Sequence, residues 1–396
     1  MSGRVRGFRF AGVHGGVKAG DALDLGLVVA DEPAVASGVF TRNRVRAAPV
    51  RISERRLKGG LCQAVLVNSG NANACTGKQG QQAALALTRS AAASLGVQTR
   101  LVVPASTGVI GVQLPTEKID ASIPSLVEDL SASGAARFAR AILTTDRAPK
   151  VAQAEVKVGR TICRVLGIAK GAGMIHPNMA TTLAFIMTDA PLRPVTLRKL
   201  LGQTTELTFN RATVDGDTST NDSIYALASG AATGRWVEEK SAAGRRFSEA
   251  LTEVLESLAK KIVADGEGAE HLVRIEVTGA RTNTDAVQIA RTIAGSQLVK
   301  TALHGCDPNW GRILAAAGRS GARFNPDHVS MSIGKISIFE CGTPVMTAKT
   351  EVMATKTMKR PEYVISVSVG AGRGLGHYWT CDLGHEYVRI NADYRT

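Results

Sequence analysis

Apolar residues along the chain follow two spacings, one typical of buried strands and one typical of helices. Near-continuous apolar runs predict strands, and an alternating stretch around Gly159 predicts a hairpin over residues 154–170. The other predicted strands lie within residues 61–70, 99–111, 181–190, 271–280, 328–345 and 362–372. The first two of these are expected to run into loops.

Helical spacing of apolar residues recurs between these strands. The clearest helix, residues 78–96, closes at Gly96, and glycine readily takes the left-handed conformation at a helix end. The other predicted helices are residues 115–130, 135–143, 196–209, 247–263, 284–303 and 309–318. Because strands and helices mix without a strict rhythm, we expect a layered α/β or α+β fold of stacked β-sheets flanked by helices. Residues 234–246 are expected to form a surface connection.

Length and composition indicate an ordinary globular protein. The 396 residues suggest two domains with a sizeable core, and 44% hydrophobic and 21% charged residues are typical of a soluble chain. No apolar stretch is long enough to span a bilayer, and residues 1–16 lack an apolar signal core, so we expect a cytoplasmic protein. The six cysteines are scattered without a C-x-x-C pair, which fits a reducing compartment and argues against a zinc ribbon.

The net charge of +14 raises the question of whether the protein binds nucleic acid. Lysine and arginine are spread along the chain, however, and the densest cluster, residues 51–60, has no interleaved aromatic residues. Aromatic content is only 4%, so surfaces on which bases could stack are scarce. The charge therefore favours a solvated face or attraction of small anionic substrates over nucleic-acid binding.

Several common catalytic signatures are missing. The chain has no P-loop, no G-x-S-x-G elbow and no H-E-x-x-H zinc motif, so we expect neither a bound cofactor nor a metal. The stretch GAGRGLGH at residues 370–377 lacks the third glycine of a dinucleotide-binding turn and is interpreted as a flexible loop.

With these signatures missing, catalysis by a threonine hydroxyl is the chemistry that remains. The candidate threonines lie where a glycine-rich loop becomes an apolar strand. Ala180, Thr181 and Thr182 stand at this junction. A threonine at a chain N-terminus can use its own α-amine as the base that activates its hydroxyl, but an internal threonine has no free amine. The chain would have to be cut before Thr181, and the small Ala180 leaves room for the hydroxyl to attack the preceding carbonyl. Two threonines at a strand start are also explained by β-propensity alone.

Residues 170–190, KGAGMIHPNMATTLAFIMTDA, closely resemble the self-cleaving segment of the ornithine acetyltransferase family. This family is also known as the bifunctional glutamate N-acetyltransferase or arginine-biosynthesis acetyltransferase family. Further blocks that resemble it follow in family order at residues 38–50, 68–77, 104–111, 142–146, 209–223, 264–270, 304–313 and 390–396. The resemblance therefore extends over nearly the whole chain.

The resemblance implies a fold similar to that of a D-aminopeptidase family, and self-cleavage between Ala180 and Thr181. The products would be an α chain of residues 1–180 and a β chain of residues 181–396, with a smaller C-terminal subdomain from about residue 282. The two chains would stay associated, as a heterotetramer of two α and two β chains.

The implied reaction moves an acetyl group from N-acetylornithine to glutamate through an acetyl-Thr181 intermediate, and gives ornithine and N-acetylglutamate. Some members also accept acetyl-CoA as donor. Matching positions make Thr181 the nucleophile and assign the oxyanion to Thr107 and Gly108. The residues that match substrate contacts are Thr144 or Thr145, Lys170, Thr181, Glu267, Asn391 and Thr396.

The chain departs from the family pattern at Glu270-His271 and at Cys306, and neither departure touches the nucleophile or the oxyanion pair. An amidase or peptidase of related fold that uses the same Thr181 is the alternative function, because water could replace glutamate as the acceptor.

Overall fold

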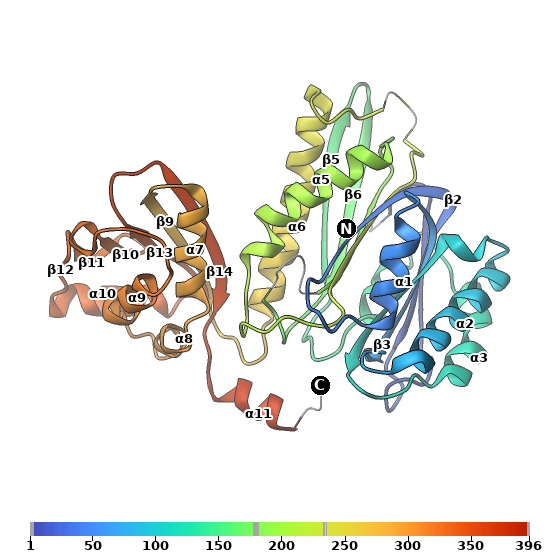
Figure 1. The fold of residues 1–396 in the computed structure, drawn as a ribbon, viewed down its shortest axis with the longest axis horizontal. Helices are drawn as coiled ribbons and strands as arrows, with labels where there is room; N and C mark the ends of the chain where they lie inside the picture. The colour runs from blue at the N-terminus through green and yellow to red at the C-terminus, as the bar shows by residue number, and fades with distance from the viewer. Residues whose placement is uncertain (1–3, 177–181, 233, 235, 394–396) are drawn as a thin grey trace.

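The computed structural model describes residues 4–176, 182–232, 234 and 236–393. Within these residues the chain forms two β-sheets with helices packed on them, as Figure 1 shows. The first sheet has the strand order β4-β3-β2-β8-β7-β6-β5, and β1 pairs with β2. Its strands are β1 (Phe8–Val13), β2 (Leu25–Phe40), β3 (Leu61–Asn71), β4 (Val102–Val109), β5 (Lys150–Val158), β6 (Thr161–Lys170), β7 (Leu183–Thr188) and β8 (Ser223–Ala228).

Helices cover both faces of this sheet. Ala184 and Ile186 of the central strand β7 belong to the core under α5 and α6, whereas Phe185 packs edge-on against Phe138 of α4 on the opposite face. Burial on both faces explains why β7 is apolar without alternation. The helices of this part are α1 (Ala48–Leu57), α2 (Gly77–Leu95), α3 (Thr116–Glu128), α4 (Ala135–Ala141), α5 (Pro194–Leu207) and α6 (Ala242–Ala264), and the short 3-10 turns are Thr99–Leu101 and Phe209–Arg211.

The second sheet lies beside the first in Figure 1 and has the order β12-β11-β10-β13-β9-β14. Its core joins β9 to α7, and Trp379 of β14 reaches back into the core of the first part. The elements are β9 (Leu272–Ala280), α7 (Asn283–Ala294), α8 (Gln297–His304), α9 (Trp310–Gly318), a 3-10 turn (Pro326–His328), β10 (Ser330–Ile333), β11 (Ile336–Glu340), β12 (Thr343–Pro344), α10 (Ala348–Met358), β13 (Glu362–Ser368), β14 (Gly374–Cys381) and α11 (His385–Asp393).

The predicted fold class is confirmed, because the chain is a mixed α/β protein whose two sheets are flanked by helices. The predicted hairpin is confirmed as β5 and β6, with Gly159 in the left-handed region at its turn. Gly96 is confirmed at the end of α2, with a φ of 69°.

Three sequence predictions need correction. The expected surface connection already contains the start of α6, because Ser241 caps that helix by accepting a hydrogen bond from the Gly244 N–H. The helical stretch 284–303 divides at Gly295 into α7 and α8. The expected flexible loop at residues 370–377 becomes strand β14 from Gly374 onward, because its backbone pairs with β9.

Candidate active site

A cleft of about 190 Å³ opens at the edge of the first sheet where β6 ends and where β7 and β8 begin. These ends meet at one edge because β7 runs antiparallel to β6 and parallel to β8. The end of β4, the loop after α4 and the C-terminal helix α11 also contribute to the lining. Seven residues predicted for the site line this cleft: Thr107, Gly108, Thr144, Thr145, Lys170, Glu267 and Asn391.

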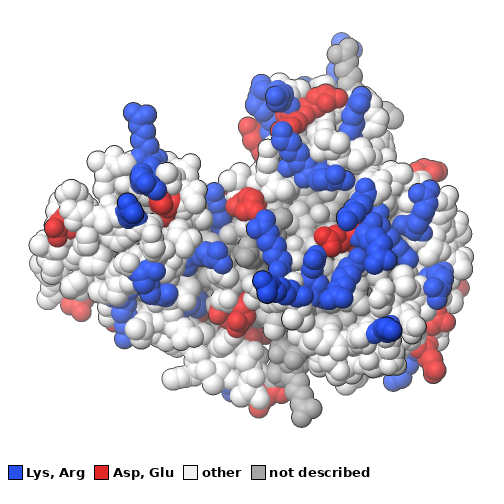
Figure 2. Space-filling model, in the orientation of Figure 1, with Lys and Arg blue, Asp and Glu red and all other residues white. Residues whose placement is uncertain are grey.

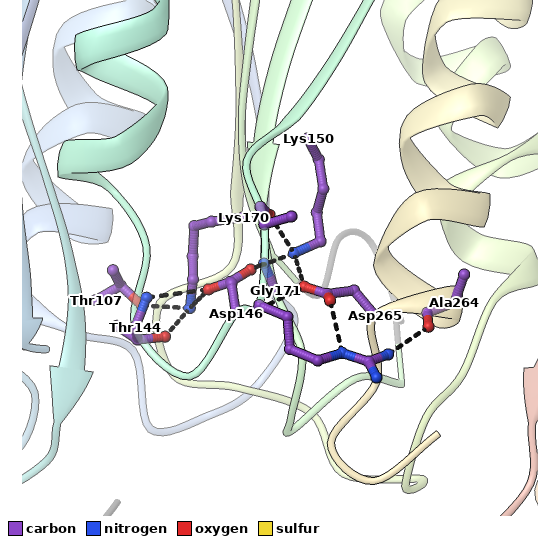
Figure 3. Close-up of polar contacts among 10 residues, drawn as sticks. Thr107, Thr144, Asp146, Lys150, Lys170, Gly171, Ala264 and Asp265 are labelled. Carbon is purple, nitrogen blue, oxygen red and sulfur yellow. Dashed lines mark hydrogen bonds and ion pairs between the residues drawn. The ribbon is translucent and has the colours of Figure 1, made fainter. Parts of the chain in front are cut away.

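Lys170, the last residue of β6, is the cation of the cleft lining and is only 8% exposed. Its ammonium group donates hydrogen bonds to Thr144 Oγ1 at 2.6 Å and to Thr107 Oγ1 at 3.2 Å (Figure 3). An ammonium group can only donate, so both hydroxyls accept from Lys170 and keep their own hydrogens available for a ligand. Burial lowers the pKa of Lys170, and the charge of Asp146 offsets part of this effect.

The Asp146 carboxylate holds Lys170 and the loop at Thr144 in place. Its buried carboxylate accepts hydrogen bonds from Lys150 Nζ at 2.6 Å, from the Gly171 N–H at 2.6 Å and from the Thr144 N–H at 3.0 Å. Its other close cation, Lys170, lies 3.8 Å away (Figure 3). Burial alone would raise the pKa of Asp146, but Lys170 and Lys150 hold this pKa well below its ordinary value. The ionised carboxylate therefore ties the loop at Thr144 to the end of β6.

Gly108 occupies a position that no other residue could take without a shift of the backbone. Its φ is +131°, and a Cβ added there would lie 2.3 Å from the carbonyl carbon of Gly70 on the neighbouring strand β3. The close approach of β3 and β4 at this point therefore explains why glycine follows Thr107.

Acidic side chains form a second group in the cleft lining, with Asp215, Asp217 and Glu267 close to the phenol of Tyr387. Asn391 of α11 donates a hydrogen bond from Nδ2 to Glu267 Oε2 at 2.7 Å, which fixes that carboxylate. The cleft thus offers an ammonium with two hydroxyls and, separately, a cluster of carboxylates. A small ligand that carries both a carboxylate and an ammonium group would suit this division of charge.

Two buried polar groups of the cleft lining, Thr182 Oγ1 and Asp222 Oδ2, have no hydrogen-bond partner among the residues that the structure describes. Burial raises the pKa of Asp222 well above its ordinary value, and Ser219 and Lys170 act in the opposite direction. The carboxyl group of Asp222 is therefore shifted toward its protonated form at the start of β8.

The predicted nucleophile Thr181, the residue before it, Ala180, and the C-terminal Thr396 lie outside the described residues. The chain on either side of residues 177–181 is well anchored. His176 accepts a hydrogen bond at its carbonyl from Thr218 Oγ1 at 2.9 Å, and the Thr182 carbonyl accepts one from the Ser223 N–H at 2.8 Å. Both anchors lie in or beside the cleft lining.

One wall of the cleft, residues 218–220, is supported from behind by residues 41–47. Thr41 Oγ1 donates to the Ser219 carbonyl at 2.9 Å, and Asn43 Nδ2 donates to the Thr218 carbonyl at 2.9 Å. These bonds place a block that resembles the family, residues 38–50, behind the cleft rather than in it.

Sequence reasoning missed four carboxylates of this site: Asp146, Asp215, Asp217 and Asp222. All four stand inside blocks that carry the family resemblance, residues 142–146 and 209–223, which is the signal that could have found them. Their roles depend on burial and on partners far away in sequence, such as Lys170 for Asp146, and no local pattern reveals these.

The described residues contain neither a metal-binding cluster nor a membrane-spanning helix. No group of three or more histidine, cysteine, aspartate and glutamate side chains there could hold a metal ion. No described helix is long and apolar enough to cross a membrane.

Comparison with known proteins agrees with the sequence blocks. A family model described as the ArgJ family matches residues 9–396. The arginine biosynthesis bifunctional protein ArgJ of Thermosynechococcus vestitus is 47% identical over 99% of this chain and 97% of its own length. The protein of the same name from Syntrophotalea carbinolica is 46% identical over 99% of this chain and 100% of its own length.

A solved structure also matches. The crystal structure of arginine biosynthesis bifunctional protein argJ from Bacillus halodurans has a TM-score of 0.51 and 43% identity, and the match covers 53% of this chain and 98% of that one. The arginine-biosynthesis family that the sequence blocks resemble is thereby confirmed, and the chain belongs to the ArgJ family.

Proposed function

We propose that this protein transfers an acetyl group from N-acetylornithine to glutamate and so produces ornithine and N-acetylglutamate. Its ArgJ relatives are named as arginine biosynthesis bifunctional proteins, which supports a reaction of amino-acid metabolism. The observation that carries the proposal is the pairing, in one cleft, of the Lys170–Thr107–Thr144 cluster with the Glu267–Asn391 pair.

These two groups match the two charged ends of the proposed donor. N-acetylornithine carries an α-carboxylate and a side-chain ammonium, separated by a short aliphatic chain. The Lys170 ammonium suits the carboxylate and the Glu267 carboxylate suits the ammonium, since charge-assisted hydrogen bonds are the strong ones. Thr145 also lines the cleft, and we propose that Thr144 makes the substrate contact, because its hydroxyl accepts a hydrogen bond from Lys170.

The proposed chemistry begins with cleavage before Thr181, which frees the α-amine of that residue. The amine takes the proton of the Thr181 hydroxyl, whose oxygen attacks the acetyl carbonyl of the donor. The carbonyl oxygen becomes negatively charged, and the Thr107 hydroxyl and the Gly108 N–H donate hydrogen bonds to it. The protonated α-amine gives its proton to the α-nitrogen of the donor, the bond from this nitrogen to the acetyl carbon breaks, and ornithine leaves. The α-amine of glutamate then attacks the acetyl-threonine ester and loses a proton to the Thr181 amine, which returns it to the Thr181 oxygen as N-acetylglutamate leaves.

The basic test is acetyl transfer by the purified protein. With N-acetylornithine and glutamate we expect N-acetylglutamate and ornithine in equal amounts. Acetate released from N-acetylornithine at the same rate with or without glutamate would instead favour the amidase. Acetyl-CoA in place of N-acetylornithine tests our further proposal that acetyl-CoA serves as a co-substrate.

A covalent acetyl-enzyme predicts ping-pong kinetics, because ornithine must leave before glutamate reacts. Initial rates at several fixed glutamate concentrations should therefore give parallel lines in a double-reciprocal plot. Mass spectrometry after brief exposure to the donor should find one acetyl group on the fragment that starts at Thr181. Intersecting lines and an unmodified fragment would indicate direct transfer within a ternary complex.

Thr107→Ala should lower kcat by roughly 10²–10³ with a smaller change in KM. The physical reason is that the Thr107 hydroxyl, which already accepts from Lys170, would donate mainly to the charge that develops in the transition state. Thr107→Ser keeps a hydroxyl and should retain much of the rate. Rates must be corrected for the fraction of cleaved chain, since cleavage passes through a similar tetrahedral centre.

Glu267→Gln is the matched control, because it removes a charge from the cleft without touching the Lys170 cluster. This variant should cleave normally and show a raised KM. Lys170→Ala is a poor control, since Lys170 itself contacts Thr107 and Thr144. A fully cleaved Thr107→Ala protein with the wild-type kcat would remove Thr107 from the mechanism.

We further propose that the cleaved chains assemble as two α and two β chains in the cytoplasm. The Bacillus halodurans chain is matched over 98% of its length by 53% of this chain, and residues 181–396 are slightly more than half of the sequence. The exposed free thiols of Cys75 and Cys341 are typical of a reducing compartment. Light scattering under native conditions would measure the mass of the assembly.

A further inference from the structure

A second hollow, distinct from the catalytic cleft, lies between the end of β2, the end of α1 and helix α5. We call it the basic groove; its volume is about 1000 Å³, and its cationic lining residues are Arg42, Arg44, Arg46, Lys58 and Arg198. Figure 2 shows lysine and arginine side chains gathered on the face of the molecule where α1 and α5 lie. The block of residues 38–50, which supports the cleft from behind, forms much of this groove.

Most of the positive charge in the basic groove is uncompensated. Glu54 pairs with Arg46 at 2.9 Å. The exposed side chains of Arg42, Arg44 and Arg198 make no ion pair or side-chain hydrogen bond within the part of the chain that the structure describes. Arginine presents a planar fork of donors that matches phosphate oxygens, so several unpaired guanidinium groups around a hollow favour a phosphorylated ligand.

The floor of the basic groove is apolar. Val39 and Leu57 are buried there, and Phe40 is half-buried with its ring edge-on to Tyr225 at 5.8 Å. Gly38 makes room for this ring, because a Cβ at that position would lie 2.6 Å from a Phe40 ring atom. An aromatic floor inside a ring of guanidinium groups suits a ligand that combines a flat ring with phosphates.

We propose that the basic groove binds a phosphorylated nucleoside, with the phosphates on Arg42, Arg44 and Arg198 and the base over Phe40. A nucleic-acid strand fits the groove less well, because Phe40 is the aromatic residue among its described lining residues and successive bases would need further rings. The bound ligand would lie against residues 41–43, which hydrogen bond to the Thr218–Ser219 wall of the catalytic cleft. The groove is therefore a second binding site beyond the proposed acetyl transfer.

The test is calorimetric titration of the purified protein with adenosine diphosphate, pyrophosphate and adenosine at physiological ionic strength. We expect saturable binding of adenosine diphosphate with one site per chain pair, and weaker binding of pyrophosphate and of adenosine. Arg44→Glu and Arg198→Glu should each weaken the binding of adenosine diphosphate by at least about tenfold, as expected for the loss of a charge-assisted hydrogen bond. Phe40→Leu should weaken the binding of adenosine diphosphate and leave the binding of pyrophosphate unchanged.

Arg319→Glu is the matched control, since Arg319 is an exposed arginine that follows α9 on the other part of the molecule and its reversal changes the net charge equally. It should weaken binding by less than about twofold. Equal weakening by all three reversals would overturn the proposal in favour of general electrostatic attraction. Absence of saturable binding, or binding of a single-stranded RNA oligonucleotide but of none of the small molecules, would overturn it as well. Because the readout is binding, these outcomes do not depend on whether the protein transfers acetyl groups.

Discussion

Thr181→Ala should leave the purified protein as a single uncut chain without acetyl transfer. The variant lacks the hydroxyl that would attack the Ala180 carbonyl, and without the cut it also lacks the free α-amine that would act as base. Removal of the one hydroxyl oxygen causes both losses, so we expect no activity above background. Denaturing electrophoresis should show one band for the variant and two for the wild type, with one wild-type fragment beginning TTLAF.

Two further variants separate Thr181 from its neighbour. Thr181→Ser keeps a hydroxyl and should still cleave, although more slowly. Thr182→Val is the matched control, because Thr182 Oγ1 is buried without a partner among the described residues and valine has nearly the same shape. The Thr182 carbonyl, held by the Ser223 N–H, keeps the start of β7 in place in either case. A cut Thr181→Ala chain, or an uncut Thr182→Val chain, would move the nucleophile away from Thr181.

The elements that sequence patterns predicted well are those that are apolar on both faces or strongly amphipathic. β3, β7, α2 and the β5–β6 hairpin were found close to their observed bounds. Two of the missed elements have weaker patterns, whereas β8 was missed although all six of its residues are buried. β2 carries Asp31, Glu32 and Pro33 in its middle, where its register with β3 shifts, and these residues hide a long strand. The C-terminal helix α11 has no buried residue, so no apolar periodicity marks it.

The residues of the candidate site were predicted mainly from the resemblance of the sequence to the family, and less from physical reasoning about the residues themselves. A threonine at a strand start, a Ser-Thr-Gly turn and a lone lysine are each common, and only the matching blocks singled them out. The structure adds why Thr107, Thr144 and Lys170 act together, since one ammonium donates to both hydroxyls. It also adds Asp146, whose importance depends on two lysines that approach it only in the folded chain.

Asp146→Asn should lower the free energy of unfolding by about 3–5 kcal/mol, the usual cost of breaking a buried ion pair. The carboxylate of Asp146 is fully buried, and the side chains of Lys150 and Lys170 are 3% and 10% exposed. An amide would leave Lys150 with Asp265 as its remaining acidic partner and would leave Lys170 without an ion pair among the described residues. Urea unfolding at neutral pH measures the difference, with Asp31→Asn as the matched control. Asp31 pairs with Arg9 at the surface, where such a pair contributes about 0–1 kcal/mol.

The pH dependence follows from the direction of the shift. The pKa of Asp146 is lower in the folded chain than in the unfolded one, so its stabilisation is complete above the ordinary aspartate value of about 3.9. This contribution declines progressively as the pH falls below that value and is lost once the pH has passed through the lower, folded value. The gap between wild type and Asp146→Asn should therefore be constant from neutral pH down to about 5 and should narrow in more acidic solution.

The same substitution should change how the cleft responds to alkaline pH. Asp146 raises the pKa of Lys170, so its removal adds to the lowering that burial already causes, and Lys170 loses its charge at a lower pH than in the wild type. If the charged Lys170 binds the substrate carboxylate, KM should rise with pH earlier in Asp146→Asn than in wild type or Asp31→Asn. An Asp146→Asn protein as stable as Asp31→Asn, with an unchanged KM profile, would show that the Asp146 carboxylate does not hold this cluster together.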